Sequence, residues 1–205
     1  MPQLDAAACE IAGALGGARP LTLPAGAGLM WAWVGFDDAP GRSALEAIGG
    51  EPRDDRVSVA VGEPASGPAG FRQSHRDAAD AAEVAMLGGR PPGSVSRFQD
   101  VELAALLVHD VDRARRFVLA HLGALASEDE EMARLRRTLM VFRDENGSRI
   151  ATARRLDVHP NTVANRVRAC REVLDRDLGS GQLELEIALR LASLLSLSVL
   201  RDGHE

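Results

Sequence analysis

The sequence has no lysine and no tyrosine, and all 24 of its basic residues are arginine. A P-loop needs the lysine of its G-x-x-x-x-G-K-[ST] motif, pyridoxal enzymes need a Schiff-base lysine, and protein kinases of the usual type need a lysine on a strand. The composition therefore excludes these three classes of enzyme.

Cysteine is scarce as well. Cys9 and Cys170 are too few for a disulfide framework or a zinc site. His109 and His121 stand twelve residues apart, and no other histidine or cysteine lies near them at ligand spacing. We therefore predict no metal and no cofactor.

The sequence also lacks a long apolar run and a signal-peptide pattern. The longest apolar run near the C-terminal end of the sequence, 191–200, is ten residues long and is interrupted by serines. It is too short to cross a bilayer. With 45% hydrophobic and 26% charged residues, the chain has the composition of a soluble globular protein. We expect a cytoplasmic protein that has no membrane partner.

Hydrophobic patterning predicts an α+β fold in two domains. The first, over residues 1–97, is a small α/β domain. Its expected elements are a helix over 1–15, a Gly/Pro loop through Gly28, a buried strand over 29–36, a short helix over 43–48, a strand over 56–62, a helix over 71–87 and a short strand over 95–98. The Gly/Pro-rich segment 88–94 precedes the domain boundary.

Residues 98–205 are predicted to be helical throughout. One helix is expected over 102–126. Ser127 and Glu130 then have the spacing of a capping box that opens the next helix, which ends near Asn146-Gly147. That helix is expected to bury four apolar residues, namely Met132, Leu135, Leu139 and Phe142. The second domain is therefore an all-helical one.

Charge is distributed unevenly along the chain. The net charge is −6, but residues 134–176 hold eleven arginines against five acidic residues, a net of +6. Affinity for phosphate depends on the local basic patch rather than on the global sum. An acidic protein can thus carry a DNA-binding face, although an arginine-rich solvated surface would have the same composition.

Residues 148–175 have the pattern of a helix-turn-helix. Ile150, Ala153 and Leu156 form an apolar stripe on a short first helix, and 157–159 form a tight connector. Pro160 suits the first position of the second helix, which His159 or a neighbour caps. At 100° per residue, the apolar residues of that helix fall in one narrow sector. They are Val163, Val167, Cys170 and Leu174.

The opposite side of the second helix is polar. Arginine can bond guanine O6 and N7, asparagine can bond adenine N6 and N7, and threonine can hold a phosphate. The arginines of the first helix suit contacts to the DNA backbone. The predicted DNA-binding residues are Arg149, Arg154, Arg155, His159, Asn161, Thr162, Asn165, Arg166 and Arg168. The alternative without a DNA-binding role is a helical hairpin with a solvated polar face.

This region resembles the C-terminal helix-turn-helix of the PucR/CdaR family of transcription regulators. The resemblance rests on Leu135–Leu139, on 146–148 and above all on L-x-V-H-x-N-T-V-x-x-R at Leu156–Arg166. It continues into 183–200, where family members carry a closing apolar helix. Asn165 and Pro160 depart from the family's usual residues, so the base preference is expected to differ.

The resemblance implies a sequence-specific regulator whose partner is double-stranded DNA. We expect a homodimer, because one short helix reads too few base pairs. The dimer surface is expected in the α/β domain or on the helix over 183–200, and any small-molecule effector is unidentified. No upstream sensory domain has room here, so the chain is a short member or a piece of a longer regulator.

A weaker resemblance covers 57–82, which looks like the degenerate GGDEF-like domain that precedes the helix-turn-helix in that family. That fold is related to diguanylate cyclases, whose metal-assisted chemistry needs positioned carboxylates. No acid follows Gly26-Ala27-Gly28, where a cyclase would place its GGDEF turn, and Gly49-Gly50-Glu51 runs into Pro52. We therefore predict no catalytic residues and no enzyme activity. The alternatives are a nucleotide-processing enzyme and an interaction module that does not bind DNA.

Overall fold

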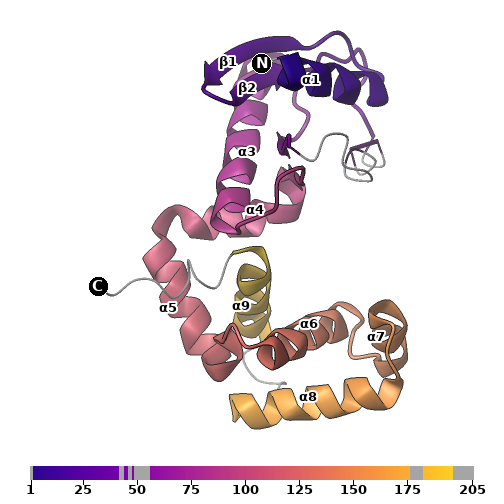
Figure 1. Ribbon diagram of the computed structural model, residues 1–205, viewed down its shortest axis with the longest axis vertical. Coiled ribbons are helices and arrows are strands. Elements are labelled where there is room, and N and C mark those ends of the chain that lie inside the picture. Colours follow the sequence, from indigo (N-terminus) through magenta and orange to yellow (C-terminus); the bar gives the residue numbers. More distant parts are fainter. Residues whose placement is uncertain (1, 42–43, 46–47, 49–55, 176–181, 196–205) are drawn as a thin grey trace. The chain divides into compact units, whose positions relative to one another are not determined.

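The computed structural model describes residues 2–41, 44–45, 48, 56–175 and 182–195 (Figure 1). They fall into two compact units, the first within Met1–Met86 and Arg90–Glu102 and the second within Leu87–Gly89 and Leu103–Glu205. The described strands lie in the first unit, and the second is helical, so the α+β fold class is confirmed. The units divide inside α4 (Phe98–Leu107), whereas we predicted a boundary between residues 97 and 98.

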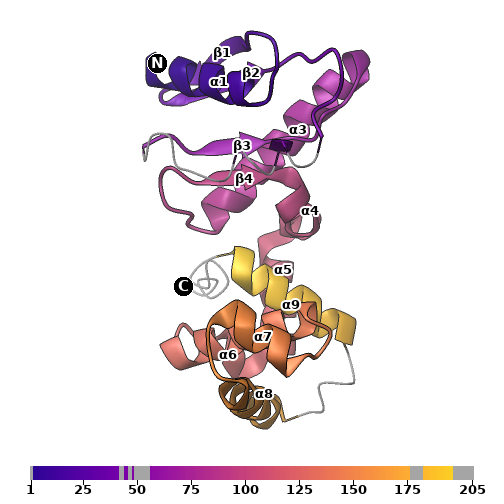
Figure 2. The ribbon, with the colours of Figure 1, turned by 90° about the vertical axis from the view of Figure 1, so that its right-hand side faces the viewer.

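The first unit contains two small sheets, in the element order α1 (Pro2–Ala14), β1 (Leu21–Gly26), β2 (Leu29–Trp33), β3 (Val59–Val61), α3 (Gly67–Leu87) and β4 (Val95–Arg97). β1 and β2 form an antiparallel hairpin, in which Leu23 lies opposite Trp31. β3 and β4 are parallel and are connected through α3 (Figure 2). Gly62 permits a close approach between the end of β3 and α3, because a Cβ at this position would lie 2.0 Å from the Ser74 carbonyl oxygen.

Aromatic rings join the hairpin to α3. Trp33 stacks on Phe71, with ring centroids 4.8 Å apart. Trp31 meets His75 edge-on at 4.5 Å. α3 therefore covers part of the hairpin face that carries both tryptophans.

Two predictions for this unit were wrong. The expected loop before Gly28 contains β1, which among the described strands pairs with β2 alone. Pro24 is tolerated there because an edge strand can lack a ladder donor. The strand expected over 29–36 ends at Trp33, and Leu29, Trp31 and Ala32 are exposed, because a two-stranded hairpin is not covered on both sides. Of the predicted helix 43–48, Ala44 and Leu45 are helical, whereas 43 and 46–47 lie outside the described residues.

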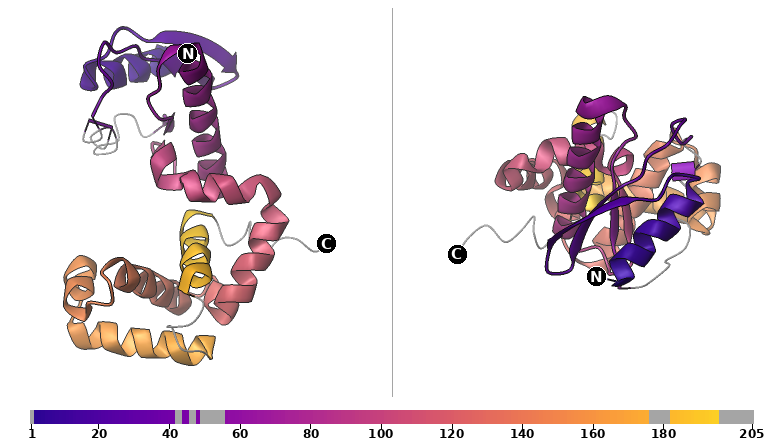
Figure 3. Two further views of the ribbon diagram at one scale, coloured as in Figure 1. Left: turned by 180° about the vertical axis from the view of Figure 1, so that it is seen from behind. Right: turned by 90° about the horizontal axis from the view of Figure 1, so that it is seen from above.

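The second unit is a helical array of α4, η1 (Val108–Asp110), α5 (Val111–Leu122), η2 (Gly123–Ala126), α6 (Glu130–Asp144), α7 (Arg149–Leu156), α8 (Pro160–Leu174) and α9 (Gln182–Leu194). Its largest fully buried side chains come from six elements: Val118, Leu122, Leu125, Thr138, Leu139, Thr152, Val163, Leu185 and Leu191. In Figure 1, Figure 2 and the left view of Figure 3, α8 runs along the outer edge of this unit, with α6 and α7 on its inner side. One long face of α8 is thus left uncovered by the described helices of this unit.

The single helix predicted over 102–126 is wrong. A 3-10 turn, η1, interrupts it, and the Asp110 side chain accepts a hydrogen bond from the Arg113 amide at the start of α5. Aspartate is a strong N-cap residue, so it begins a new helix where apolar periodicity alone predicts continuation.

The predicted capping box is also wrong. Asp129, not Ser127, caps α6, accepting from the amides of Glu131 (2.8 Å) and Met132 (3.3 Å). Ser127 Oγ instead accepts from the Asp129 amide at 3.2 Å. Of the four apolar residues expected inside, Leu135 and Leu139 are buried, while Met132 and Phe142 are half-buried.

Among the described helices, none combines the length and apolar character that crossing a bilayer requires.

Candidate nucleic-acid interface

The first helix of the pair, α7, has well-defined ends. Ser148 is its N-cap, and its hydroxyl accepts from the Ala151 amide at 3.3 Å. Asp157 ends the helix in the left-handed conformation (φ 53°, ψ 50°), with its amide donating to the Arg154 carbonyl and the Val158 amide to the Ala153 carbonyl. This pair of bonds is a Schellman motif, and aspartate is one of the few non-glycine residues that adopt left-handed dihedrals readily. The chain therefore turns sharply at the predicted connector.

The second helix, α8, begins as predicted. His159 is the N-cap, and its Nδ1 accepts from the Asn161 amide at 3.1 Å. Pro160 occupies the first helical turn, where its lack of an N–H costs no hydrogen bond. The start of α8, and hence the rotation of its faces, follows from local chemistry.

The inner face of α8 packs against α6 and α7. Val163, Val167 and Cys170 are buried, and Leu174 is half-buried. The Cys170 thiol donates to the Leu135 carbonyl at 3.6 Å. Burial raises the pKa of this thiol to about 12 from an ordinary value of 9.0, and a smaller effect, a hydrogen bond from the backbone of Cys170 itself, opposes that rise.

Ionisation of Cys170 gives a pH dependence of known sign. As the pH rises, the unfolded state loses the thiol proton before the folded state does, so the folded state loses stability between pH 9 and about 12. We expect the free energy of unfolding to fall in this window by at most about 1.4 kcal/mol per pH unit. Urea titrations followed by circular dichroism at several alkaline pH values measure this slope. Cys170→Ala should show a shallower slope, and equal slopes would contradict the assignment.

The outer face of α8 presents the polar residues predicted to read bases. Asn161, Asn165 and Arg168 are exposed. Arg168 Nη2 donates to Asn165 Oδ1 at 3.2 Å, and Arg168 Nε lies 3.9 Å from the Glu172 carboxylate. The structure thus brings Asn165 and Arg168 together on the face opposite the core.

Thr162 and Arg166 lie on the flank of α8 and are half-buried. Arg166 Nη1 donates at 3.3 Å to the hydroxyl of Thr138, a fully buried residue of α6. Its guanidinium is therefore held against α6, and its contact with DNA stays a prediction.

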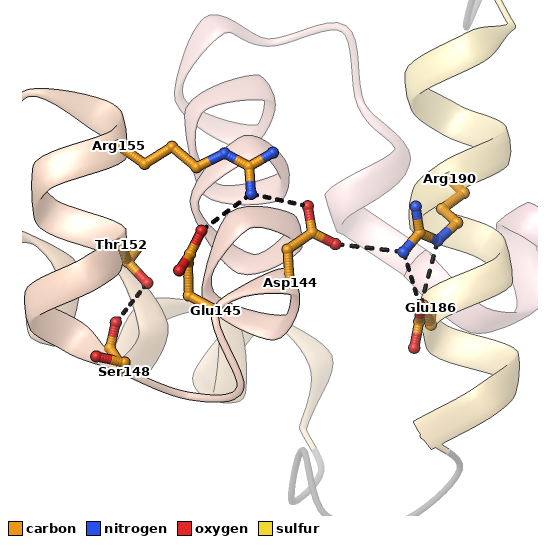
Figure 4. A network of polar contacts seen from close by, with 7 residues as sticks. All are labelled: Asp144, Glu145, Ser148, Thr152, Arg155, Glu186 and Arg190. Carbon is orange, nitrogen blue, oxygen red and sulfur yellow. Dashed lines mark hydrogen bonds and ion pairs between the residues drawn. The ribbon is translucent and has the colours of Figure 1, made fainter. Parts of the chain in front are cut away.

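The three arginines predicted on α7 differ in their surroundings. All are exposed. Within the described part of the chain, Arg149 and Arg154 form no ion pair, whereas Arg155 contacts Asp144 and Glu145 at the end of α6 (Figure 4). The basic surface of α7 therefore consists of two arginines that lack such partners and one that is paired.

Sequence reasoning did not find two structural arginines. Arg136, counted above within the basic segment, donates to the carbonyls of Leu125 and Ser127 and so ties η2 to α6; burial lowers the pKa of its guanidinium. Arg190 of α9 pairs with Asp144 and Glu186. The contacts of Arg136 and the Arg190–Asp144 pair join segments that are distant in sequence, so local patterning does not predict them.

The predicted stripe on α7 was wrong at one position. Ile150 is 67% exposed, and the buried residues of this helix are Thr152 and Ala153. The Thr152 hydroxyl donates to the Ser148 carbonyl at 2.7 Å, which permits its burial. Within the described residues, no group of three histidine, cysteine or acidic side chains could hold a metal ion.

These elements define a helix-turn-helix, and comparisons identify its kind. The model of the PucR C-terminal helix-turn-helix domain matches residues 135–191, and that of the GGDEF-like domain matches residues 2–84. The chain thus contains a segment that matches a GGDEF-like domain, followed by one that matches the PucR-type helix-turn-helix domain.

Two individual proteins are similar to this chain. The purine catabolism regulatory protein of Bacillus subtilis (strain 168) is 35% identical over 97 residues, which are 46% of this chain and 18% of that relative. The chain thus matches less than a fifth of that relative's length. The second is a regulator of polyketide synthase expression from Bifidobacterium adolescentis, which has a crystal structure and is 22% identical to this chain. The match covers 99% of this chain and 77% of that one, with a TM-score of 0.33.

Proposed function

We propose that this chain is a cytoplasmic, sequence-specific transcription regulator that binds double-stranded DNA through α8. One observation carries the proposal: α8 buries Val163, Val167 and Cys170 and exposes Asn161, Asn165 and Arg168 on its opposite face. A helix of this kind fits the major groove, where arginine and asparagine distinguish base pairs by bidentate hydrogen bonds.

Contacts to the sugar–phosphate backbone come from the other elements of the motif. Arg149 and Arg154 extend from α7, the helix that crosses the backbone in this type of docking. Three further residues that we predict to contact DNA lie beside the base-reading face of α8: His159, Thr162 and Arg166. Phosphate contacts orient the protein without reading sequence. In this proposal α7 therefore contacts the backbone and α8 reads the bases.

The function is tested by selecting duplexes from a random library with the wild-type protein. The selected duplex and a scrambled duplex of the same composition are then titrated at several salt concentrations. We expect tighter binding to the selected duplex, and a logarithmic salt slope of about −0.9 for each phosphate contacted. Equal affinity for both duplexes would leave only non-specific binding, and no affinity for either would favour the interaction-module alternative.

We further propose that the GGDEF-like domain, predicted over residues 1–97, has no catalytic role. The carboxylates that metal-assisted nucleotidyl transfer requires are absent from the sequence positions where a cyclase would hold them. Incubation with nucleoside triphosphates and magnesium should give no product, and turnover would contradict this assignment.

The β1–β2 hairpin is the surface we propose for homodimerisation. Leu21, Leu23, Leu29 and Trp31 are exposed on it. No charged residue stands between Arg19 and Asp37, a property that suits self-association, because in a two-fold dimer each surface meets its own copy and a charge would face itself. A second copy of this chain is therefore the occupant that the hairpin fits.

Leu23→Asp should convert the dimer to a monomer in sedimentation velocity at micromolar concentration, because two carboxylates would be brought together in an apolar contact. Leu183→Asp, on the exposed start of α9, is the matched control and should leave the dimer intact. A wild-type monomer, or dissociation by the α9 variant alone, would refute the assignment of this surface.

A further inference from the structure

Five charged side chains connect three helices around the end of α6. Arg155 Nη1 of α7 lies 3.4 Å from Asp144 Oδ2 and 3.1 Å from Glu145 Oε1. Arg190 Nη2 of α9 lies 3.2 Å from Asp144 Oδ1 and 3.0 Å from Glu186 Oε1. Figure 4 shows Asp144 between the two guanidinium groups, with α7 and α9 on either side of it.

The two carboxylates of this network lie at the C-terminal end of α6, where nearby arginines can stabilise them. Asp144 is the last residue of α6 and Glu145 is its C-cap. The C-terminal end of a helix carries partial negative charge, so acids are unfavourable there and nearby cations offset them. Their side chains are only 22% and 30% exposed, so water screens the pairs less than it would on an open surface. Loss of Arg155 would leave both acids without their contact to α7.

We propose that Arg155 is a positioning residue, which holds α7 to α6 and, through Asp144, to α9, and does not contact a DNA phosphate. The inference rests on the proposed function and revises the role that the sequence predicts for this arginine. Among the arginines of α7, phosphate contacts then belong to Arg149 and Arg154. The network fixes α7, and thereby α8, relative to the rest of the second unit.

A purely electrostatic role and a positioning role of Arg155 predict different effects on DNA affinity for one pair of variants. Arg155→Gln removes a positive charge and Asp144→Asn removes a negative one, so a purely electrostatic effect would weaken DNA binding in the first and tighten it in the second. Positioning requires both to weaken binding to the selected duplex, by about three- to tenfold each, as for coupled members of one network. The double variant should lose less than the product of the two single losses, because both single variants remove the Arg155–Asp144 contact.

Salt dependence separates the roles further. Arg154→Gln is the matched control, the neighbouring exposed arginine of α7, and should make the salt slope shallower by about 0.9. Arg155→Gln should leave the slope unchanged, and Arg155→Lys should restore most of the affinity because it keeps an ammonium near Glu145. Circular dichroism melts establish that each variant is folded, and Asp144→Asn, which leaves Arg155 in place, still separates positioning from charge should Arg155→Gln fail to fold.

Tighter binding by Asp144→Asn, or a slope change in an Arg155 variant equal to that of Arg154→Gln, would overturn this inference alone. Wild-type protein that binds neither the selected nor the scrambled duplex would overturn the proposed function, and this inference with it.

Discussion

Replacement of Arg168 by alanine is expected to relax the sequence preference of the protein while leaving its affinity for scrambled DNA nearly unchanged. A bidentate arginine–guanine contact discriminates against a wrong base by about 1–3 kcal/mol, or roughly 5- to 150-fold. Arg168 stands exposed on the outer face of α8, paired with Asn165 through a 3.2 Å hydrogen bond. Titration of the selected duplex and its single-base variants measures the loss, which should fall on one base-pair position.

The control for this prediction is Arg154→Ala on α7. It should weaken binding to the selected and scrambled duplexes by the same factor, because a phosphate contact carries no sequence information. If Arg168→Ala weakened both duplexes equally, as Arg154→Ala should, α8 would not be the reading element.

Truncation of Leu139 to alanine is expected to cost about 2–5 kcal/mol of unfolding free energy, because the lost methyl groups leave a cavity in a packed core. Leu139 is fully buried on α6, the helix against which the inner face of α8 packs. Urea unfolding should be followed by circular dichroism, since both tryptophans lie in the first unit and would not report on α6 by fluorescence.

Ile150→Ala is the matched control for Leu139→Ala. The two side chains are similar in size, but Ile150 is 67% exposed, so its truncation should change the unfolding free energy by no more than about 0.5 kcal/mol. A large loss in this variant would show that Ile150 is covered in solution and would restore the apolar stripe that the sequence predicts.

The position and orientation of α8 could be predicted from sequence because the determinants of this helix are local. The His159 cap, Pro160 in the first turn and the spacing of Val163, Val167 and Cys170 lie within a dozen residues and agree with one another. Periodicity then decides which side chains face outward. The family resemblance independently predicts a helix-turn-helix in this region, and the matched domain model confirms that motif.

Two features were missed because they depend on polar contacts rather than on apolar spacing. Ile150 has the right spacing for a core stripe, yet Thr152 occupies the buried position because its hydroxyl finds a partner in the Ser148 carbonyl. The two acids that hold Arg155 come from the preceding helix, and one of them also contacts α9. Apolar periodicity records neither a hydrogen-bonded threonine nor an ion pair between helices, so neither could be derived from the sequence.

The cap on α8 also constrains what His159 can offer a nucleic acid. Since Nδ1 accepts the Asn161 amide proton, the neutral ring must carry its own hydrogen on Nε2. A ring in that tautomer is only a donor toward the groove, so it can meet phosphate oxygens, guanine N7 or O6, or thymine O4, and cannot accept from the amino groups of adenine or cytosine. In the predicted contact of His159 with DNA, this tautomer would therefore exclude cytosine, whose major-groove edge offers only a donor.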